Sequence, residues 1–193
     1  MFLNNSNAIE EKGVYGISMY ALGVPHTVLV DDYIPMKKDR RGRYSNLFSS
    51  VKGEKNGGDE ALWGSIIEKA FAKFYGNYYH IEGGYSHKAI EAFVGGPYEM
   101  IDHYEKDNKD NEITDVDTLW TRLMAHDLNH EMFGAEPDRY PKNGIVSHHA
   151  YTTLGVTDLV PGERLVHVRN PWGKKERYTG PWCDECAEWD GVS

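Results

Sequence analysis

The sequence has few cysteines, no long apolar run and no excess of positive charge. Two cysteines in 193 residues, Cys183 and Cys186, are too few for a disulfide framework, so we expect free thiols in a reducing, cytoplasmic setting. No apolar stretch approaches the ~20 residues of a membrane span, and the start, MFLNNSNAIEEK, lacks the basic and apolar regions of a secretory signal. The formal net charge of −9 argues against a nucleic-acid-binding protein.

The chain does contain enough apolar material for a folded core. Hydrophobic residues make up 40% of the sequence and aromatic residues 12%, which is typical of a globular rather than a disordered protein. No stretch has the composition of a linker, so we expect residues 1–193 to form a single domain. For residues 1–12 two alternatives stay open, a disordered stretch or a segment added for expression.

Positive charge gathers in one short run, KKDRRGR. Its basic residues are Lys37, Lys38, Arg40, Arg41 and Arg43. The run follows Pro35 and contains Gly42, so it is predicted to be a solvated loop. A localisation signal or an anion-binding patch stays open as an alternative.

Apolar periodicity predicts strands on both sides of a group of helices. The segments with strand character are residues 14–23, 26–35, 44–51, 145–156 and 163–170. Apolar residues at helical spacing predict helices near residues 60–75, 86–94 and 115–128. This order predicts an α+β fold, in which a twisted antiparallel sheet or open barrel is flanked by the helices.

Particular residues are suited to the ends of these elements. Asp59 and Ser86 are expected to cap the first two helices, and Gly76 to end the first of them. Asp31 and Asp32 are expected to end the second strand and to bond to loop backbone. They do not form a natural acid–base pair, because adjacent strand residues point to opposite faces.

The last two predicted strands bring a histidine and an asparagine together. In IVSHHAYTTLGV (residues 145–156), strand alternation sends His148 and His149 to opposite faces. A hairpin centred near residue 160 places His149 opposite Asn170, with Cβ atoms about 5 Å apart. The amide oxygen of an asparagine can then fix the imidazole tautomer and leave the other ring nitrogen free to exchange a proton. The plain structural alternative, a packed histidine beside a turn asparagine, stays open at this point.

Several motifs resemble the calpain family of papain-like cysteine proteases. The family's histidine lies in an HAY motif and its asparagine in NPWG, and this chain reads HAYTT at His149 and RNPWG at Asn170. VLVDDYIP, LWGSIIEKAFAKFYGNYYHIEGG, EAFVGG and GPWCDECAEW are similar to further family segments. The matches follow the family's order from about residue 14 to about residue 190.

The resemblance implies the second subdomain of a calcium-dependent intracellular endopeptidase that cleaves proteins through an acyl-thioester. It makes His149 the general base and acid, Asn170 its orienting partner and Trp172 the tryptophan that shields the pair. In the family the nucleophilic cysteine belongs to a first subdomain that this chain lacks, so the chain alone is expected to be inactive. That Cys-bearing subdomain is the expected partner, and protein chains are the expected substrates.

The resemblance also implies part of a calcium site, formed by Glu176 and Asp184. Calcium needs several oxygen ligands, so two carboxylates alone do not make a site. The family reads E-W-T-G where this chain reads ERYTG, with one extra residue. Two exposed acidic residues without calcium therefore stay open as the alternative.

Three other assignments compete with this one. A calpain-like scaffold without protease activity would carry a residue other than cysteine in its first half, and the retained His149 and Asn170 favour an active parent over it. His126 and His130 would share a helical face, as in zinc proteases, if the helix extended that far, with Glu131 or His103 as a conceivable third ligand. Neither cysteine has the context of a nucleophile, a zinc site or a redox pair, so both are expected to be ordinary thiols.

Overall fold

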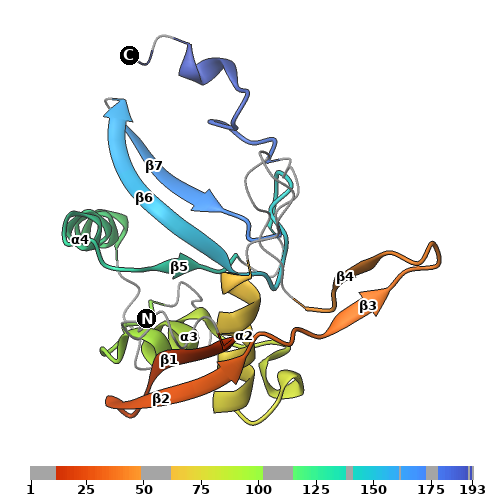
Figure 1. The fold of residues 1–193 in the computed structure, drawn as a ribbon. Coiled ribbons are helices and arrows are strands. Elements are labelled where there is room, and N and C mark those ends of the chain that lie inside the picture. Colours follow the sequence, from red (N-terminus) through yellow and green to blue (C-terminus); the bar gives the residue numbers. More distant parts are fainter. Residues whose placement is uncertain are drawn as a thin grey trace. The chain divides into compact units, whose positions relative to one another are not determined.

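The chain forms two compact units. The computed structural model describes residues 12–48, 62–101, 115–137, 141–160, 162–172, 178–190 and 192. The N-terminal unit is Met1–Tyr98 and the C-terminal unit is Glu99–Ser193 (Figure 1). The single domain expected over residues 1–193 stays a prediction, and the expectation for the first residues falls almost entirely outside the described part.

The N-terminal unit begins with a β-hairpin. Strand β1 (Val14–Ala21) pairs antiparallel with β2 (Val24–Asp31), from Val14 opposite Asp31 to Ala21 opposite Val24. Leu22 and Gly23 join them with φ of 51° and 75°. Two successive positive φ values give a tight turn whose twist matches that of the paired strands. Both predicted strands are present, but the second begins at Val24 instead of residue 26 and ends at Asp31 instead of residue 35.

One face of this hairpin supplies four of the six buried residues of the hydrophobic core cluster. Ile17 and Met19 on β1 are fully buried, and Val28 and Val30 on β2 nearly so, which is the period-two pattern of a strand with one covered face. Helix α2 (Trp63–Phe74) covers that face with Ile66 and Ala70, among others. Part of the predicted helical stripe over residues 60–75 is therefore core, whereas Leu62 and Trp63 on the same stripe are 43% and 54% exposed.

The helix ends agree only in part with the sequence prediction. Helix α2 ends as expected, with Gly76 at φ 105° just beyond it, but the predicted cap Asp59 lies outside the described residues. Helix α3 (Ser86–Val94) begins with Ser86 inside the helix and Tyr85 at the cap, without a side-chain hydrogen bond, so the predicted Ser86 cap is wrong. A short 3₁₀ helix, η1 (Tyr78–Ile81), lies between them.

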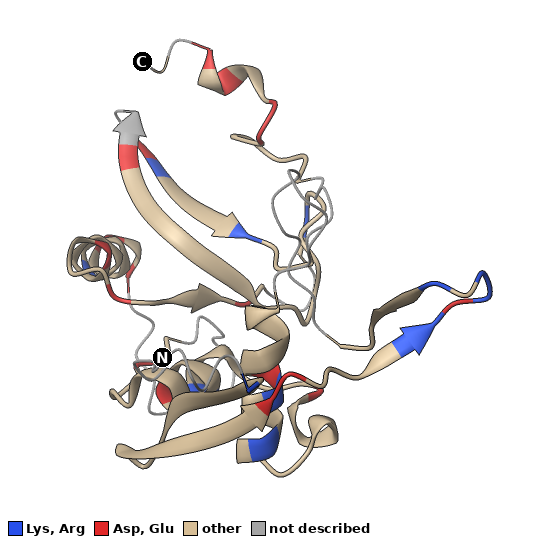
Figure 2. Ribbon diagram, in the orientation of Figure 1, with Lys and Arg blue, Asp and Glu red and all other residues tan. Residues whose placement is uncertain are grey.

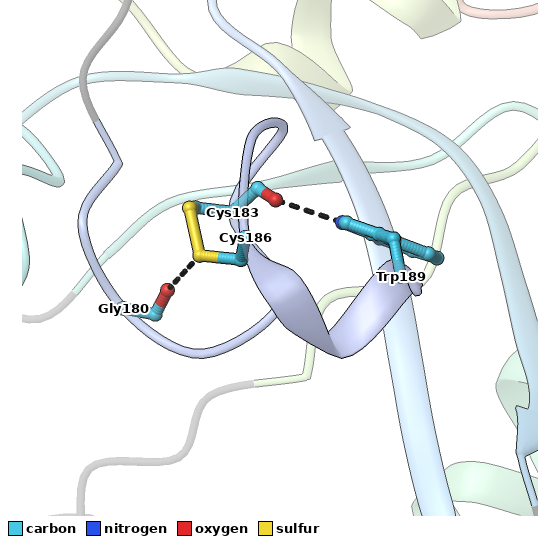
Figure 3. The surroundings of a disulfide bond; sticks show 4 residues. All are labelled: Gly180, Cys183, Cys186 and Trp189. Carbon is cyan, nitrogen blue, oxygen red and sulfur yellow. Dashed lines mark hydrogen bonds between the residues drawn. A yellow bond between two sulfur atoms is a disulfide. The ribbon is translucent and has the colours of Figure 1, made fainter. Parts of the chain in front are cut away.

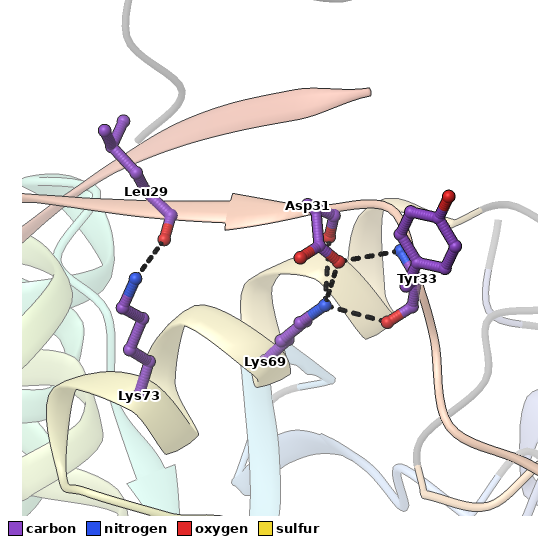
Figure 4. A network of polar contacts seen from close by, with 5 residues as sticks. All are labelled: Leu29, Asp31, Tyr33, Lys69 and Lys73. Carbon is purple, nitrogen blue, oxygen red and sulfur yellow. Dashed lines mark hydrogen bonds and ion pairs between the residues drawn. The ribbon is translucent and has the colours of Figure 1, made fainter. Parts of the chain in front are cut away.

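Polar contacts fasten the end of β2 to helix α2 (Figure 4). Lys69 Nζ bonds to the Asp31 carboxylate, to the Asp31 carbonyl at 3.3 Å and to the Tyr33 carbonyl at 2.8 Å, while Lys73 Nζ donates to the Leu29 carbonyl at 2.8 Å. The Lys69 ammonium and the Tyr33 N–H hold the pKa of Asp31 below its ordinary value. Asp31 thus closes the strand and bonds to loop backbone, as predicted.

The basic run forms a second hairpin rather than a loop alone. Strand β3 (Met36–Lys38) pairs antiparallel with β4 (Tyr44–Asn46). The prediction missed β3, and it made β4 longer than the three residues that are described as strand. Every residue from Met36 to Ser45 is exposed, so the predicted solvation of the run is confirmed.

The described part of the C-terminal unit contains one α-helix and a three-stranded antiparallel sheet. Helix α4 (Val116–Leu128) begins at Asp115, whose carboxylate accepts the N–H of Asp117 at 2.9 Å, an N-terminal cap. The sheet has the order β5 (Gly134–Ala135), β6 (Tyr151–Val160), β7 (Glu163–Arg169). A 3₁₀ helix, η2 (Ala187–Trp189), follows.

The predicted α+β class is confirmed. All strand pairs in the described part are antiparallel, and the sheets there stay open rather than closing into a barrel. Helices α2, α3 and α4 match the three predicted near residues 60–75, 86–94 and 115–128. Among the described residues, no helix has the length and apolar character needed to cross a membrane.

Candidate active site

The two adjacent histidines lie in a turn before strand β6. The strand begins at Tyr151, six residues later than predicted. His148 has φ 51°, in the left-handed region, and it is exposed. A left-handed residue cannot continue an extended strand, so the prediction that alternation separates His148 from His149 is wrong in its premise.

The register of the last hairpin also differs from the predicted one. Thr152 pairs with Arg169, and two bulges, between Thr153 and Gly155 and between Thr157 and Val160, shift the register along β6 and β7. His149 and Asn170 therefore lie just beyond the paired residues and not opposite each other within them.

The turn nevertheless brings the two predicted side chains together. His149 Nε2 lies 2.7 Å from Asn170 Oδ1, and both residues are partly buried. Asn170 Oδ1 also accepts the backbone N–H of Trp172 at 3.1 Å, across Pro171. Because the Trp172 backbone N–H can only donate, the atom that accepts from it is the amide oxygen and not the amide nitrogen. Nε2 must then carry the hydrogen, and in the neutral ring Nδ1 keeps a lone pair that can take a proton.

Two aromatic rings border the imidazole of His149. The ring centre of Trp172 lies 4.4 Å from that of His149, and the ring centre of Tyr151 lies 5.1 Å away in an edge-on arrangement. Trp172 is 56% exposed whereas Tyr151 is 6% exposed. The imidazole of His149 therefore contacts one buried ring, Tyr151, and one exposed ring, Trp172. The Trp172 ring can shield the His149–Asn170 hydrogen bond from water.

Tyr151 has a second contact that sequence reasoning missed. Its hydroxyl oxygen accepts the backbone N–H of Val146 at 3.0 Å. His148 and His149 lie in the turn between Val146 and Tyr151. The bond links the two ends of this turn, since Tyr151 is the first residue of β6. The spacing of Tyr151 two residues after His149 was the available signal, since it predicts a shared face, but it does not predict the bond to Val146.

Comparison with known proteins assigns this chain to a family. The model of the family described as calpain family cysteine protease matches residues 1–193. The chain belongs to the calpain family. It is 32% identical over 184 residues to Calpain-type cysteine protease ADL1 of Oryza sativa subsp. japonica, covering 93% of this chain and 8% of that protein.

Animal calpains give similar matches. Calpain-14 of Homo sapiens is 28% identical over 202 residues, which cover 99% of this chain and 26% of the human protein. A calpain of Schistosoma mansoni is 30% identical over 189 residues, which cover 95% of this chain and 23% of that protein. The chain thus spans about a quarter or less of the length of these relatives.

Only one of the two calcium ligands implied by the calpain resemblance lies in the described part. Asp184 is exposed, and Glu176 lies outside the described residues. No group of three or more His, Cys, Asp or Glu residues in the described ranges is arranged to hold a metal ion. One exposed carboxylate does not provide the six to eight oxygen ligands that calcium takes. The partial calcium site stays a prediction.

The two cysteines of this calpain-family chain are joined, contrary to the prediction of ordinary thiols. Cys183 and Cys186 form a disulfide, with Cα atoms 5.0 Å apart (Figure 3). The Cys186 N–H donates to the Cys183 carbonyl at 3.0 Å, and this tight turn brings the two side chains within bonding reach. Trp189 Nε1 donates to the same carbonyl at 2.7 Å. The cytoplasmic setting, which drew on free thiols, loses that support.

The alternative zinc site requires His126 and His130 to lie on one helix, but the helix ends before His130. Helix α4 stops at Leu128, and His130 has φ 56° beyond its end, so the two histidines do not share a helical face. His126 Nδ1 lies 2.6 Å from Glu131 Oε2. His103, a conceivable third ligand, lies outside the described residues. The geometric basis of this alternative is therefore wrong.

Proposed function

We propose that this chain carries the histidine–asparagine part of a calpain-type cysteine endopeptidase. The observation that supports it best is the 2.7 Å bond between His149 Nε2 and Asn170 Oδ1. That bond leaves the Nδ1 lone pair of a neutral, oriented imidazole for proton transfer. Membership of the calpain family names the reaction class, which is hydrolysis of peptide bonds.

In the proposed reaction, His149 first acts as a general base. Nδ1 takes the proton of a cysteine thiol, and the thiolate attacks the carbonyl carbon of the scissile peptide bond. When the tetrahedral intermediate collapses, the C–N bond breaks and the protonated imidazole gives its proton to the leaving amine. An acyl-thioester remains. His149 then takes a proton from water, whose oxygen attacks the thioester carbonyl, and the proton returns to the departing sulfur.

Asn170 and Trp172 have positioning roles in this scheme. Asn170 accepts from Nε2–H whether the ring is neutral or protonated, so it holds one orientation through both proton transfers. The Trp172 N–H fixes Oδ1 in turn, and the indole lies 4.4 Å from the imidazole. Excluding water from the Nε2–Oδ1 bond strengthens it, because hydrogen bonds are electrostatically stronger at low dielectric constant.

The thiolate in this proposal comes from another part of the enzyme. Cys183 and Cys186, the two cysteines of this chain, are bonded to each other. We therefore propose a Cys-bearing subdomain as the partner and protein chains as substrates, in an intracellular enzyme. Calcium dependence belongs to the proposal through the family alone, and no step above involves the ion.

The test uses the full-length protein that contains this chain, with an unfolded protein such as casein as substrate in the presence of calcium. His149→Ala is expected to abolish cleavage, and Asn170→Ala to lower kcat by about tenfold to a hundredfold. His148→Asn is the matched control, because it removes the adjacent, exposed histidine and asparagine tolerates a positive φ. We expect its activity to stay close to that of the unaltered protein.

The same experiment distinguishes an active protease from a calpain-like scaffold without protease activity. A full-length protein that cleaves nothing, and whose upstream sequence has no G-x-C-W motif, would be a calpain-like binding protein. Equal loss of activity in His148→Asn and His149→Ala would contradict the assignment of the base to His149. Turnover by the isolated chain that disappears on changing Cys183 would overturn the proposed source of the thiolate.

A further inference from the structure

A second surface lies in the N-terminal unit, on the hairpin that carries the positive run. We call residues Met36–Asn46 the basic hairpin. Figure 2 shows the positions of Lys and Arg, in blue, around the tip of this hairpin and on the adjoining strand. The basic side chains of this hairpin are Lys37, Lys38, Arg40, Arg41 and Arg43.

The turn of the basic hairpin is braced from inside by Asp39. The Asp39 carboxylate accepts the backbone N–H of Arg41 at 2.8 Å and that of Arg43 at 2.9 Å, and it accepts from Arg43 Nε at 2.8 Å. These bonds to Arg43 hold the pKa of Asp39 below its ordinary value. The single carboxylate of the hairpin thus bonds within its own turn, and its ion pair is with Arg43.

The base of the basic hairpin is anchored to the rest of its unit. Asn46 is buried, and its Nδ2 donates to Ser65 Oγ on helix α2 at 3.1 Å. The Leu47 N–H donates to the Pro35 carbonyl at 2.9 Å and so continues the pairing beyond the strands. A braced turn on an anchored base gives a preorganised projection, which lowers the entropy lost when a partner binds.

The charge of the basic hairpin opposes that of the remaining chain. Its five basic residues and one acidic residue give a net charge of +4, so the other residues together carry −13 of the total of −9. Opposite charge attracts an anionic partner to the hairpin itself, and the attraction acts over a Debye length of roughly 10 Å.

We infer that the basic hairpin docks an acidic, extended peptide segment of a partner protein. Arginine guanidinium groups bind carboxylates in a planar, two-pronged geometry, and Arg40 and Arg41 are exposed on the turn. Met36 and Tyr44 are 46% and 65% exposed and offer apolar contact beside the charges. In the described part, β3 and β4 pair only with each other, so each has an outer edge to which an extended peptide can add.

The test measures binding of a labelled peptide of alternating glutamate and serine to the full chain by fluorescence anisotropy. Arg40→Glu combined with Arg41→Glu is expected to weaken binding about tenfold or more at low salt. The matched control combines Lys12→Glu with Lys142→Glu, which are exposed positions and give the same change in net charge. We expect less than about a threefold effect from the control, because long-range charge alone is screened.

Each other outcome overturns the inference. Equal weakening by both double variants would mean that total charge, not the hairpin, attracts the peptide. Absence of binding to the unaltered chain would remove the proposed partner. Tighter, hairpin-dependent binding to phosphatidylserine vesicles or duplex DNA than to the peptide would identify a different class of partner. Circular dichroism checks folding, and Arg40→Gln with Arg41→Gln gives a milder pair if charge reversal unfolds the chain. The result does not depend on His149 or Asn170.

Discussion

The two units of the chain differ in how many buried hydrophobic residues they contain and in which of them carries the candidate active site. Among the described residues, eight of the ten buried hydrophobic residues belong to the N-terminal unit, and two, Tyr151 and Val156, to the C-terminal unit. Helix α2 buries part of its apolar stripe, whereas helix α4 has no fully buried residue. The candidate active site lies in the unit with the smaller described core, so its geometry depends more on hydrogen bonds and ring contacts.

The strongest test of this contrast removes apolar volume from the N-terminal core. Ile17 is fully buried in that core. Ile17→Ala is expected to lower the free energy of unfolding by about 2–5 kcal/mol, through lost burial and the cavity left behind. Leu29→Ala, 54% exposed on the neighbouring strand, is the control and should cost less than about 1 kcal/mol. Urea denaturation of both variants measures the difference, and equal costs would contradict the assigned core.

The next test removes a polar contact in the C-terminal unit. Asn170→Ala deletes the acceptor shared by His149 Nε2 and the Trp172 N–H, and we expect a loss of about 1–2 kcal/mol in the free energy of unfolding. The imidazole should also lose its fixed tautomer, which ¹⁵N NMR of the histidine ring reports. His148→Asn is the control for the spectral assignment. An unchanged His149 tautomer in Asn170→Ala would show that another group orients the ring.

A third test measures how much the N-terminal cap at Asp115 stabilises helix α4, which has no fully buried residue. The Thr118 hydroxyl and the N–H groups of Asp117 and Thr118 bond to the Asp115 carboxylate and lower its pKa from the ordinary 3.8. Its stabilising effect is therefore present above pH 3.8 and is lost as the pH falls through the lowered folded value.

Asp115→Asn keeps a good cap but does not titrate, so it isolates this contribution. We expect the unfolding midpoint of the variant to fall less than that of the unaltered chain between about pH 5 and about pH 2, a range that spans the ordinary aspartate pKa of 3.8. Urea denaturation across that range measures the two slopes. Parallel slopes would mean that Asp115 does not contribute to the acid sensitivity.

A smaller effect is expected at the disulfide, which joins neighbouring residues of one turn. Iodoacetamide should modify neither Cys183 nor Cys186 until a reductant is added, and both afterwards, as mass spectrometry would show. Because the closed loop is short, reduction should change the unfolding midpoint little. Modification of either cysteine in the absence of reductant would contradict the pairing.

The smallest effect is expected from calcium. With Asp184 exposed, we expect calorimetry to show weak binding or none by the chain alone. Changing Glu176 and Asp184 to their amides should remove whatever binding is measured. Tight binding that survives this double change would place the calcium site elsewhere in the chain.

Sequence reasoning succeeded where burial repeats with a fixed period. The alternation of Ile17 with Met19 predicts strand β1, and the spacing of Ile66 and Ala70 predicts helix α2, because each repeat follows from the geometry of one element. The proximity of His149 and Asn170 was also predicted, although by a register that the structure does not have.

The errors arise where a single backbone angle or a local turn decides the outcome. Because His148 has a positive φ, strand β6 begins later than predicted, and bulges shift its pairing with β7. Neither feature produces a periodic pattern in the sequence. The turn that joins Cys183 to Cys186 likewise depends on one backbone hydrogen bond. Ser86 resembles a cap by residue type, yet it lies inside helix α3, and Tyr85, with extended backbone angles, takes the cap position.

The shared acceptor at Asn170 also explains why an amide, and not a carboxylate, suits this position. An aspartate would offer the same oxygen to Nε2 and to the Trp172 N–H, so the ring orientation would survive. Its negative charge, however, would favour the protonated, positive imidazole and leave it less able to accept a further proton. The neutral amide aligns the ring while adding no net charge beside it, which suits the proposed reaction, in which His149 both takes and gives a proton.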